Sequence, residues 1–306
     1  MISHRFGCAA AIASACLMLT DCSGESGSSV PYPGLGALQQ NAFEHQRAGS
    51  LLFVSDSGTN DVSVFSFPKG APVRTLDAAF SEPQGECTDG KNVYVANTEA
   101  SNVVEFAADG STPTRTIDDQ GYFPGFCSYD STTGDLAVGN IISTTSGPGS
   151  IAIYRKSSGK PHFITSNKTF EIFSVQYDGS GNLFMTGFDA QFYPFFGELP
   201  AGSKHIKIIC SSTSTIGFPG ALGWDGRYIV VGGTGGVYRV RGCTNIGFTP
   251  LDGGGEGDFY IDGKYLVMAY PGSSSVQTYD YPKGGAAIST IGGFYLPIGV
   301  VAVKAR

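Results

Sequence analysis

Three carboxylates stand shortly before Asp-Gly pairs and could bind a cation. Glu86 precedes Asp89-Gly90, while Glu256 and Asp258 precede Asp262-Gly263. A hard divalent cation needs several converging oxygen atoms, and three carboxylates are a small ligand set for it. Two interpretations therefore stay open: these residues form a binding site, or they are loop acids in contact with solvent.

Histidines that could act as a catalytic base are scarce. From residue 51 onward the sequence contains only His162 and His205, and neither stands beside an obvious nucleophile. A Ser-His-Asp set needs its base placed against the nucleophile. We therefore expect no catalytic residue of this kind, no resident metal and no cofactor. The glycine runs at 232–236 and 253–257 lead into further strand patterns, so they predict hairpin turns and not phosphate loops.

The densest aromatic run spans residues 188–196 and includes Phe192, Tyr193 and Phe195. Exposed aromatic rings can stack on sugars or contact a partner protein. Such rings also fill the space between packed sheets. The run is therefore a candidate surface, with core packing as the alternative.

The segments that would position these residues are short runs of alternating apolar residues, which are typical of β-strands. An Asp, often followed by Gly, closes one such run and opens the next. It recurs at intervals of roughly 40 residues, at Asp89, Asp130, Asp178, Asp225 and Asp262. Asp-Gly is favoured in tight hairpins. A unit of this length with four strands is typical of a propeller blade.

A second marker, an aromatic residue followed by Pro and Gly, precedes the first strand of several units. Phe80, Pro83 and Gly85 share their spacing with Phe294, Pro297 and Gly299 at the end of the chain. The last strand of the chain therefore occupies the first position of a unit, but no second strand follows it. The strand pattern at the start, from Leu51, begins with the second strand of a unit and lacks a first one. The sequence therefore predicts an all-β, six-bladed propeller of four-stranded blades, closed by the C-terminal strand, which completes the N-terminal blade. The predicted blades are 295–306 with 51–79, then 80–121, 122–168, 169–216, 217–252 and 253–294.

Residues 82–97, with the order Pro-x-Gly, Asp, and Asn-aromatic-Val-Ala-Asn, resemble the NHL-repeat and TolB-like six-bladed propellers. That resemblance implies the fold but not an activity, because propellers host many unrelated functions. A related family, the gluconolactonase and SMP-30-like hydrolases, holds a divalent metal at the channel mouth. By this resemblance, Glu86, Glu256 and Asp258 would be the channel-mouth acids.

Four cysteines lie in the predicted propeller. Pairing by neighbouring blade gives Cys87 with Cys127 and Cys210 with Cys243. Packed sheets stand about 10 Å apart, whereas the Cα atoms of a disulfide lie within ~7 Å, so these bridges require the blades to converge locally. Four buried free thiols are the alternative.

The N-terminus predicts export. Residues 1–21 combine a short polar start with the apolar stretch from Phe6 to Leu19, as a signal peptide does. The segment Leu19-Thr20-Asp21-Cys22 resembles the bacterial lipoprotein signal, which implies that Cys22 is the lipid attachment site. Asp21 departs from that pattern, which has Gly, Ala or Ser there, and a cleaved, freely secreted protein is the alternative. Residues 22–50 are rich in Ser, Gly, Gln and Pro and predict a flexible tether ahead of the 51–306 domain.

The amino-acid composition excludes some classes of function. Charged residues make up only 15% of the chain and the formal net charge is -7, which gives no electrostatic reason to bind nucleic acid. A 41% hydrophobic content is too high for a disordered chain. We expect a monomeric propeller of the bacterial cell envelope, contacting the membrane only through its lipid anchor. It would bind an unknown protein or small-molecule ligand. The alternative is a metal-dependent hydrolase of the gluconolactonase type.

Overall fold

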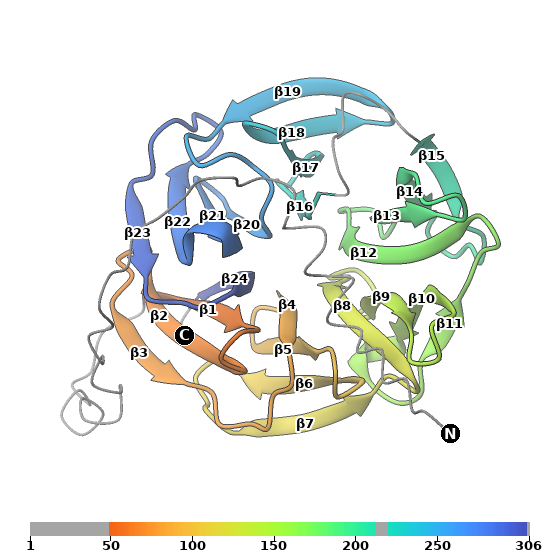
Figure 1. Cartoon of the computed structure of the whole chain (residues 1–306), viewed down its shortest axis with the longest axis horizontal. Coiled ribbons are helices and arrows are strands. Elements are labelled where there is room, and N and C mark those ends of the chain that lie inside the picture. Colours follow the sequence, from red (N-terminus) through yellow and green to blue (C-terminus); the bar gives the residue numbers. More distant parts are fainter. Residues whose placement is uncertain (1–48, 212–219, 305–306) are drawn as a thin grey trace, which may run out of the picture. The chain divides into compact units, whose positions relative to one another are not determined.

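The computed structural model describes residues 49–211 and 220–304. All of these residues belong to the compact unit Gln46–Arg306. The predicted signal peptide, Cys22 and nearly all of the predicted tether lie outside the described residues. The described chain forms six four-stranded antiparallel sheets, arranged as blades around a ring (Figure 1). The predicted all-β, six-bladed propeller is confirmed.

Within each blade the strands follow one another from the innermost strand, beside the channel, to the outermost strand. Blade 1 contains β24 (Pro297–Lys304), β1 (Ser50–Asp56), β2 (Asp61–Phe67) and β3 (Pro72–Thr75). Blade 2 contains β4 (Pro83–Thr88), β5 (Asn92–Asn97), β6 (Asn102–Ala107) and β7 (Pro113–Asp118). Blade 3 contains β8 (Tyr122–Tyr129), β9 (Leu136–Ser143), β10 (Pro148–Tyr154) and β11 (His162–Ile164).

Blade 4 contains β12 (Thr169–Tyr177), β13 (Leu183–Asp189), β14 (Pro194–Leu199) and β15 (Lys207–Ser211). Blade 5 contains β16 (Leu222–Trp224), β17 (Ile229–Gly233), β18 (Gly236–Arg241) and β19 (Thr244–Pro250). Blade 6 contains β20 (Phe259–Asp262), β21 (Tyr265–Tyr270), β22 (Ser275–Asp280) and β23 (Ser289–Gly292). Two short helical turns also occur: η2 (Arg155–Ser157) connects β10 and β11 of blade 3, and η3 (Pro271–Ser273) connects β21 and β22 of blade 6.

The ring is closed by the C-terminal strand. β24 pairs with β1 in an antiparallel register that runs from Ser50 opposite Lys304 to Asp56 opposite Pro297. The last strand of the chain is thus the innermost strand of blade 1, while the other three strands of that blade come from the start of the described chain. This arrangement covers the strand edge that β1 would otherwise leave open.

The repeated Asp residues shape the turns between the first and second strands of the blades. The Asp89 carboxylate accepts hydrogen bonds from the backbone N–H groups of Lys91 and Asn92, at 2.7 and 2.6 Å. Asp130, Asp178 and Asp225 accept equivalent bonds from residues two positions further on. Gly90 and Gly226 take positive φ angles of 83° and 90°, which glycine adopts without strain. These carboxylates hold turns, which explains why the sequence repeats them.

The hydrophobic core is divided among the contacts between neighbouring blades. In the described residues six buried clusters occur, and each combines side chains from two adjacent blades around the ring. Phe53, Val301 and Val95, for example, join blades 1 and 2. A strand inside a blade is therefore buried on both faces.

Candidate functional site

The innermost strands enclose a cavity of about 190 Å³ on the axis of the ring. All six contribute to its wall, near the ends of the strands that lead into the Asp turns. Representative wall residues, from β4, β8, β12, β16, β20 and β24 in that order, are Glu86, Tyr129, Gln176, Trp224, Tyr260 and Val300. This cavity is smaller than the pockets of about 300–1,000 Å³ that take drug-sized ligands.

Glu86 is the most unusual group in this wall. Its side chain is only 7% exposed, and among the described residues neither carboxyl oxygen has a hydrogen-bond partner. Burial raises the pKa of Glu86 well above its ordinary value, and the nearby charge of Asp258 raises this pKa further. A buried polar group without a partner costs the folded state about 1–3 kcal/mol, so the fold alone gives no reason to keep a glutamate here.

Asp258 lies in the same cavity wall, directly before β20. Its Oδ2 atom accepts a hydrogen bond of 3.1 Å from the backbone N–H of Val300 in β24. Burial raises the pKa of Asp258 to about 8, although hydrogen bonds from the N–H groups of Val300 and Phe259 act in the opposite direction. Burial therefore favours the protonated form of both carboxyl groups in the channel.

The contact of Asp258 with Val300 belongs to a series of links between neighbouring innermost strands. The Ser174 hydroxyl accepts a hydrogen bond of 3.0 Å from the N–H of Leu222, which joins blades 4 and 5. Ser128 accepts one of 2.9 Å from the N–H of Tyr177, which joins blades 3 and 4. Asp258 takes the same place as Ser174, four residues before the turn Asp of its blade. Asp258 is thus a link between blades 6 and 1, whereas Glu86 makes no such link.

Of the three predicted channel-mouth acids, only Glu86 and Asp258 line the same cavity. Glu86 and Asp258 come from blades 2 and 6, and the ring places them on either side of β24. Glu256 does not line this cavity: it is exposed in the turn before β20, with its Oε1 atom 3.4 Å from the Thr234 hydroxyl. Including Glu256 was wrong, because the chain passes from solvent to the channel wall across the single residue Gly257, which separates Glu256 from Asp258. The interpretation of Glu86 as a solvated loop acid was also wrong.

The aromatic part of the wall was not predicted from the sequence. Tyr129, Trp224 and Tyr260 line the cavity from blades 3, 5 and 6. The ring of Tyr129 is stacked on that of Tyr94, with centroids 6.5 Å apart and planes 9° apart. These wall residues stand one or two positions before the turn Asp of their blades, so the repeat register could have found them. The lining also contains no Lys, Arg or His.

The metal-dependent alternative needs a set of ligands. Within residues 49–211 and 220–304, no group of three or more His, Cys, Asp or Glu side chains is placed to hold a metal ion. Glu86 and Asp258 are two carboxyl groups in a wall of aromatic and hydroxyl side chains. Such a wall suits a ligand that donates hydrogen bonds or carries a positive charge.

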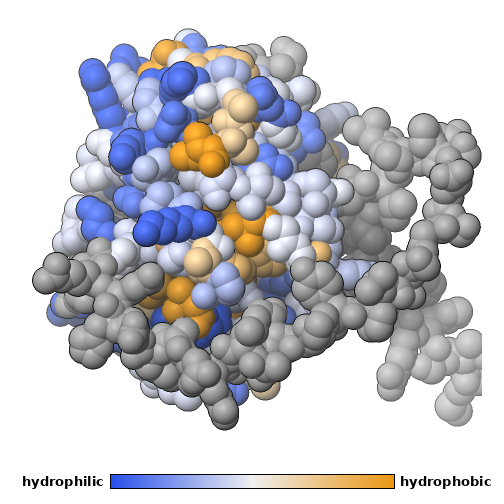
Figure 2. Space-filling model, turned by 90° about the vertical axis from the view of Figure 1, so that its left-hand side faces the viewer, coloured by the Kyte–Doolittle hydropathy of each residue, from blue (hydrophilic) through white to orange (hydrophobic). Residues whose placement is uncertain are grey.

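The predicted aromatic surface is partly correct. Phe192 and Tyr193, at the tip of the hairpin between β13 and β14, are 60% and 56% exposed. Phe195 is only 3% exposed and packs in the core between blades 3 and 4, so its inclusion was wrong. Phe196 beside it packs against blade 5, because β14 is covered on both faces and only the hairpin tip reaches solvent. The outer flank of the ring shows apolar patches separated by polar surface (Figure 2).

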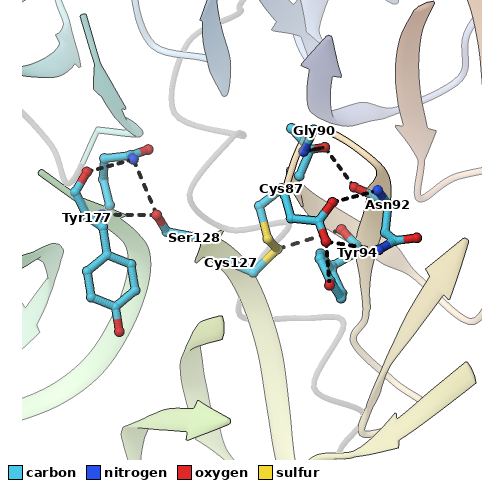
Figure 3. The surroundings of a disulfide bond; sticks show 10 residues. Cys87, Gly90, Asn92, Tyr94, Cys127, Ser128 and Tyr177 are labelled. Carbon is cyan, nitrogen blue, oxygen red and sulfur yellow. Dashed lines mark hydrogen bonds between the residues drawn. A yellow bond between two sulfur atoms is a disulfide. The ribbon is translucent and has the colours of Figure 1, made fainter. Parts of the chain in front are cut away.

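Both cysteine pairs form disulfides. Cys87 in β4 is bonded to Cys127 in β8, with Cα atoms 5.5 Å apart (Figure 3). Cys210 in β15 is bonded to Cys243 in the turn after β18, with Cα atoms 5.7 Å apart. Innermost strands converge towards the axis, which gives Cys87 and Cys127 the short separation that parallel stacking of sheets would not provide. This first bridge is part of the channel wall.

Replacing Cys87 and Cys127 together by Ala should lower the free energy of unfolding by about 3–4 kcal/mol, as removing a cross-link over a loop of this length does. Urea unfolding followed by far-UV circular dichroism measures this loss. A reducing agent should destabilise the wild type further than the double variant, since only the wild type still has both bridges to lose. Equal unfolding midpoints for the oxidised wild type and the variant would contradict this prediction.

The two histidines lie away from the channel. His162 is exposed in the outermost strand of blade 3, and His205 is exposed in the turn before β15. The helical segments of the described chain are too short to cross a membrane.

Comparisons with known proteins show the fold. No family model matches the chain, and no curated protein matches it. A chain of the crystal structure of a nidogen/laminin complex superposes with a TM-score of 0.69 at 14% identity, covering 83% of this chain and 98% of that one. The crystal structure of a functionally unknown protein from Desulfotomaculum acetoxidans DSM 771 superposes with a TM-score of 0.55 at 9% identity, with the same coverages of 83% and 98%. At these identities the likeness is one of architecture, and this protein is a six-bladed β-propeller whose activity must be argued from its channel.

Proposed function

We propose that this protein is an exported, membrane-anchored propeller that binds a small ligand in its central channel and performs no catalysis of its own. The observation that carries this proposal is Glu86, a buried carboxyl group that lines the cavity and has no hydrogen-bond partner among the described residues. An apolar side chain would be more stable in that place. A ligand that donates hydrogen bonds to Glu86 would offset the cost of burying it.

Trp224 provides a direct test, because it is the only tryptophan in the chain and it lines the cavity. Its fluorescence should change saturably when a small ligand enters. The probes are three classes of small molecule: organic ammonium ions, neutral alcohols and sugars, and carboxylates. We expect saturation with at least one class, and loss of that response in Glu86→Leu. If no class changes the emission up to its solubility limit, channel binding is wrong.

The N-terminal sequence and the two disulfides support the proposal that the protein is exported and anchored to a membrane. Two disulfides in the described chain are typical of proteins that fold in an oxidising compartment. The signal at residues 1–21 and the cysteine behind it support attachment of lipid to Cys22. Stable anchoring takes more than one acyl chain, so the full lipid modification is needed. Cys22→Ser should move the protein from the membrane fraction to the soluble one, and Asp21→Gly should increase processing. A wild-type protein that is wholly soluble, with no mass added at its N-terminus, would exclude the anchor and leave plain secretion.

A further inference from the structure

We propose that the ligand of the channel is a small organic cation with a primary or secondary ammonium group, held by Glu86 and Asp258 and surrounded by the aromatic residues of the wall. This inference rests on the proposed function, since it names the chemical class that the same cavity takes. It is argued from the charges, the hydrogen-bond partners and the size of the cavity.

The charges of the wall favour a cation. Glu86 and Asp258 are the acidic groups that line the cavity, and no basic side chain stands among the lining residues. An anionic ligand would meet two carboxyl groups without any compensating positive charge. A cationic ligand would instead supply the positive partner that a buried carboxylate requires.

The hydrogen bonds of the two carboxyl groups favour an ammonium ion with N–H donors. Both oxygens of Glu86 are free to accept within the described structure. Asp258 is held from one side by the N–H of Val300, so its position is fixed before a ligand arrives. A primary ammonium group has three donors and can satisfy both oxygens of Glu86 together with Asp258. A quaternary ammonium ion has none and would leave the oxygens of Glu86 without donors.

The remaining wall suits the rest of such a ligand. Tyr129, Trp224 and Tyr260 contribute aromatic rings, and the negative face of such a ring attracts a nearby cation. The volume of about 190 Å³ limits the ligand to a short chain. A metal ion is a poorer fit, because two carboxyl groups are fewer ligands than Ca²⁺ or a structural Zn²⁺ requires.

Binding of the cation must displace protons. Glu86 and Asp258 are both uncharged when each retains its proton, so an ammonium ion that binds between them releases at least one proton to solvent. The other titratable groups of the wall are the phenols of Tyr129 on β8 and Tyr260 on β20. Burial raises the pKa of Tyr129, and it raises the pKa of Tyr260 to about 12, so both phenols stay uncharged through the neutral range. Cys87 and Cys127 are bonded to each other and do not titrate. The affinity for the ammonium ion should therefore rise with pH through the neutral range.

The experiment compares three series of probes by Trp224 fluorescence. Ethylammonium, butylammonium and hexylammonium are each titrated against the alcohol and the carboxylate of the same chain length. We expect saturable binding of at least one ammonium ion, at least tenfold tighter than that of its alcohol, with no response to the carboxylate. Glu86→Gln should weaken ammonium binding at least tenfold. The control Glu256→Gln should leave it unchanged, because Glu256 lies outside the cavity wall.

A measurement on the wild type alone guards against a variant that fails to fold. The dissociation constant of the bound ammonium ion should fall at least tenfold between pH 6 and pH 8, where both the probe and the tyrosines keep their charge states. If an alcohol binds as tightly as its ammonium counterpart, or if the affinity is independent of pH, the inference that the ligand is a cation is wrong, but the proposal that the channel binds a small ligand is retained. If no probe of any series binds, both the inference of a cationic ligand and the proposed binding function are wrong.

Discussion

Deletion of residues 295–306 should abolish cooperative folding of the propeller. These residues include β24, which is the innermost strand of blade 1 and pairs with β1 along its whole length. Val301 and Val303 pack into the core between blades 1 and 2, whereas Val300 and Ala302 pack into the core between blades 6 and 1. Burying a valine side chain contributes about 1.5–3 kcal/mol, and burying that of Ala302 contributes less. The loss of all four residues and of the pairing with β1 therefore approaches the whole stability of a domain, about 5–15 kcal/mol.

Differential scanning calorimetry of the truncated protein measures this effect, with deletion of residues 23–45 as the matched control. The control removes more residues, but they precede the compact unit that begins at Gln46. We expect no cooperative transition without 295–306 and an unchanged midpoint without 23–45. Equal midpoints for the two deletions would show that the ring does not depend on closure by β24.

Stability should fall as the pH rises from about 4 to 8, which is the opposite of ordinary acid denaturation. The pKa values of Glu86 and Asp258 are higher in the folded protein than their ordinary values of 4.5 and 3.8. In that range the folded state binds more protons than the unfolded state. The stabilisation is complete below the unfolded pKa and is lost as the pH rises through the folded pKa, at up to about 1.4 kcal/mol per pH unit for each group. For Asp258 the loss ends near pH 8.

Urea unfolding between pH 4 and 8 measures this dependence. The double variant Glu86→Gln, Asp258→Asn should lose most of the slope, because neither replacement titrates, while Asn keeps an acceptor for the N–H of Val300. Glu256→Gln should retain the wild-type slope. Equal slopes for the wild type and the double variant would mean that the two carboxyl groups are already ionised in the folded protein over this range.

One further buried group contributes to the same slope. Asp119 is fully buried and accepts a hydrogen bond from the Tyr154 hydroxyl, which joins blades 2 and 3. Burial raises the pKa of Asp119 to about 7. The slope that remains in the double variant up to about pH 7 should therefore decrease on adding Asp119→Asn. This third variant separates the channel carboxyl groups from the core carboxyl group.

The architecture could be predicted from the repeats in the sequence, because the same local chemistry recurs from blade to blade. Each turn Asp, as at Asp89 and Asp225, needs only the N–H groups that follow it in the chain. The Pro and Gly spacing shared by residues 83–85 and 297–299 identified the C-terminal strand as a first strand without a continuation. Closure by β24 followed from that count. Such features depend on neighbours within a few residues, so they can be found without knowing the fold.

The residues that form the site could not be predicted in the same way, because contacts between blades bring them together. Glu86 and Asp258 are far apart in the sequence, and they share one cavity because ring closure places β24 between their blades. Ser174 and Asp258 occupy equivalent repeat positions and both link neighbouring strands, whereas Glu86 is left without a partner by its place in the wall. Phe195 is buried while Tyr193 is exposed, because a blade is covered on both faces and its hairpin tip is not. The burial and the hydrogen-bond partners of a side chain depend on contacts between blades, and the sequence pattern within one blade does not predict them.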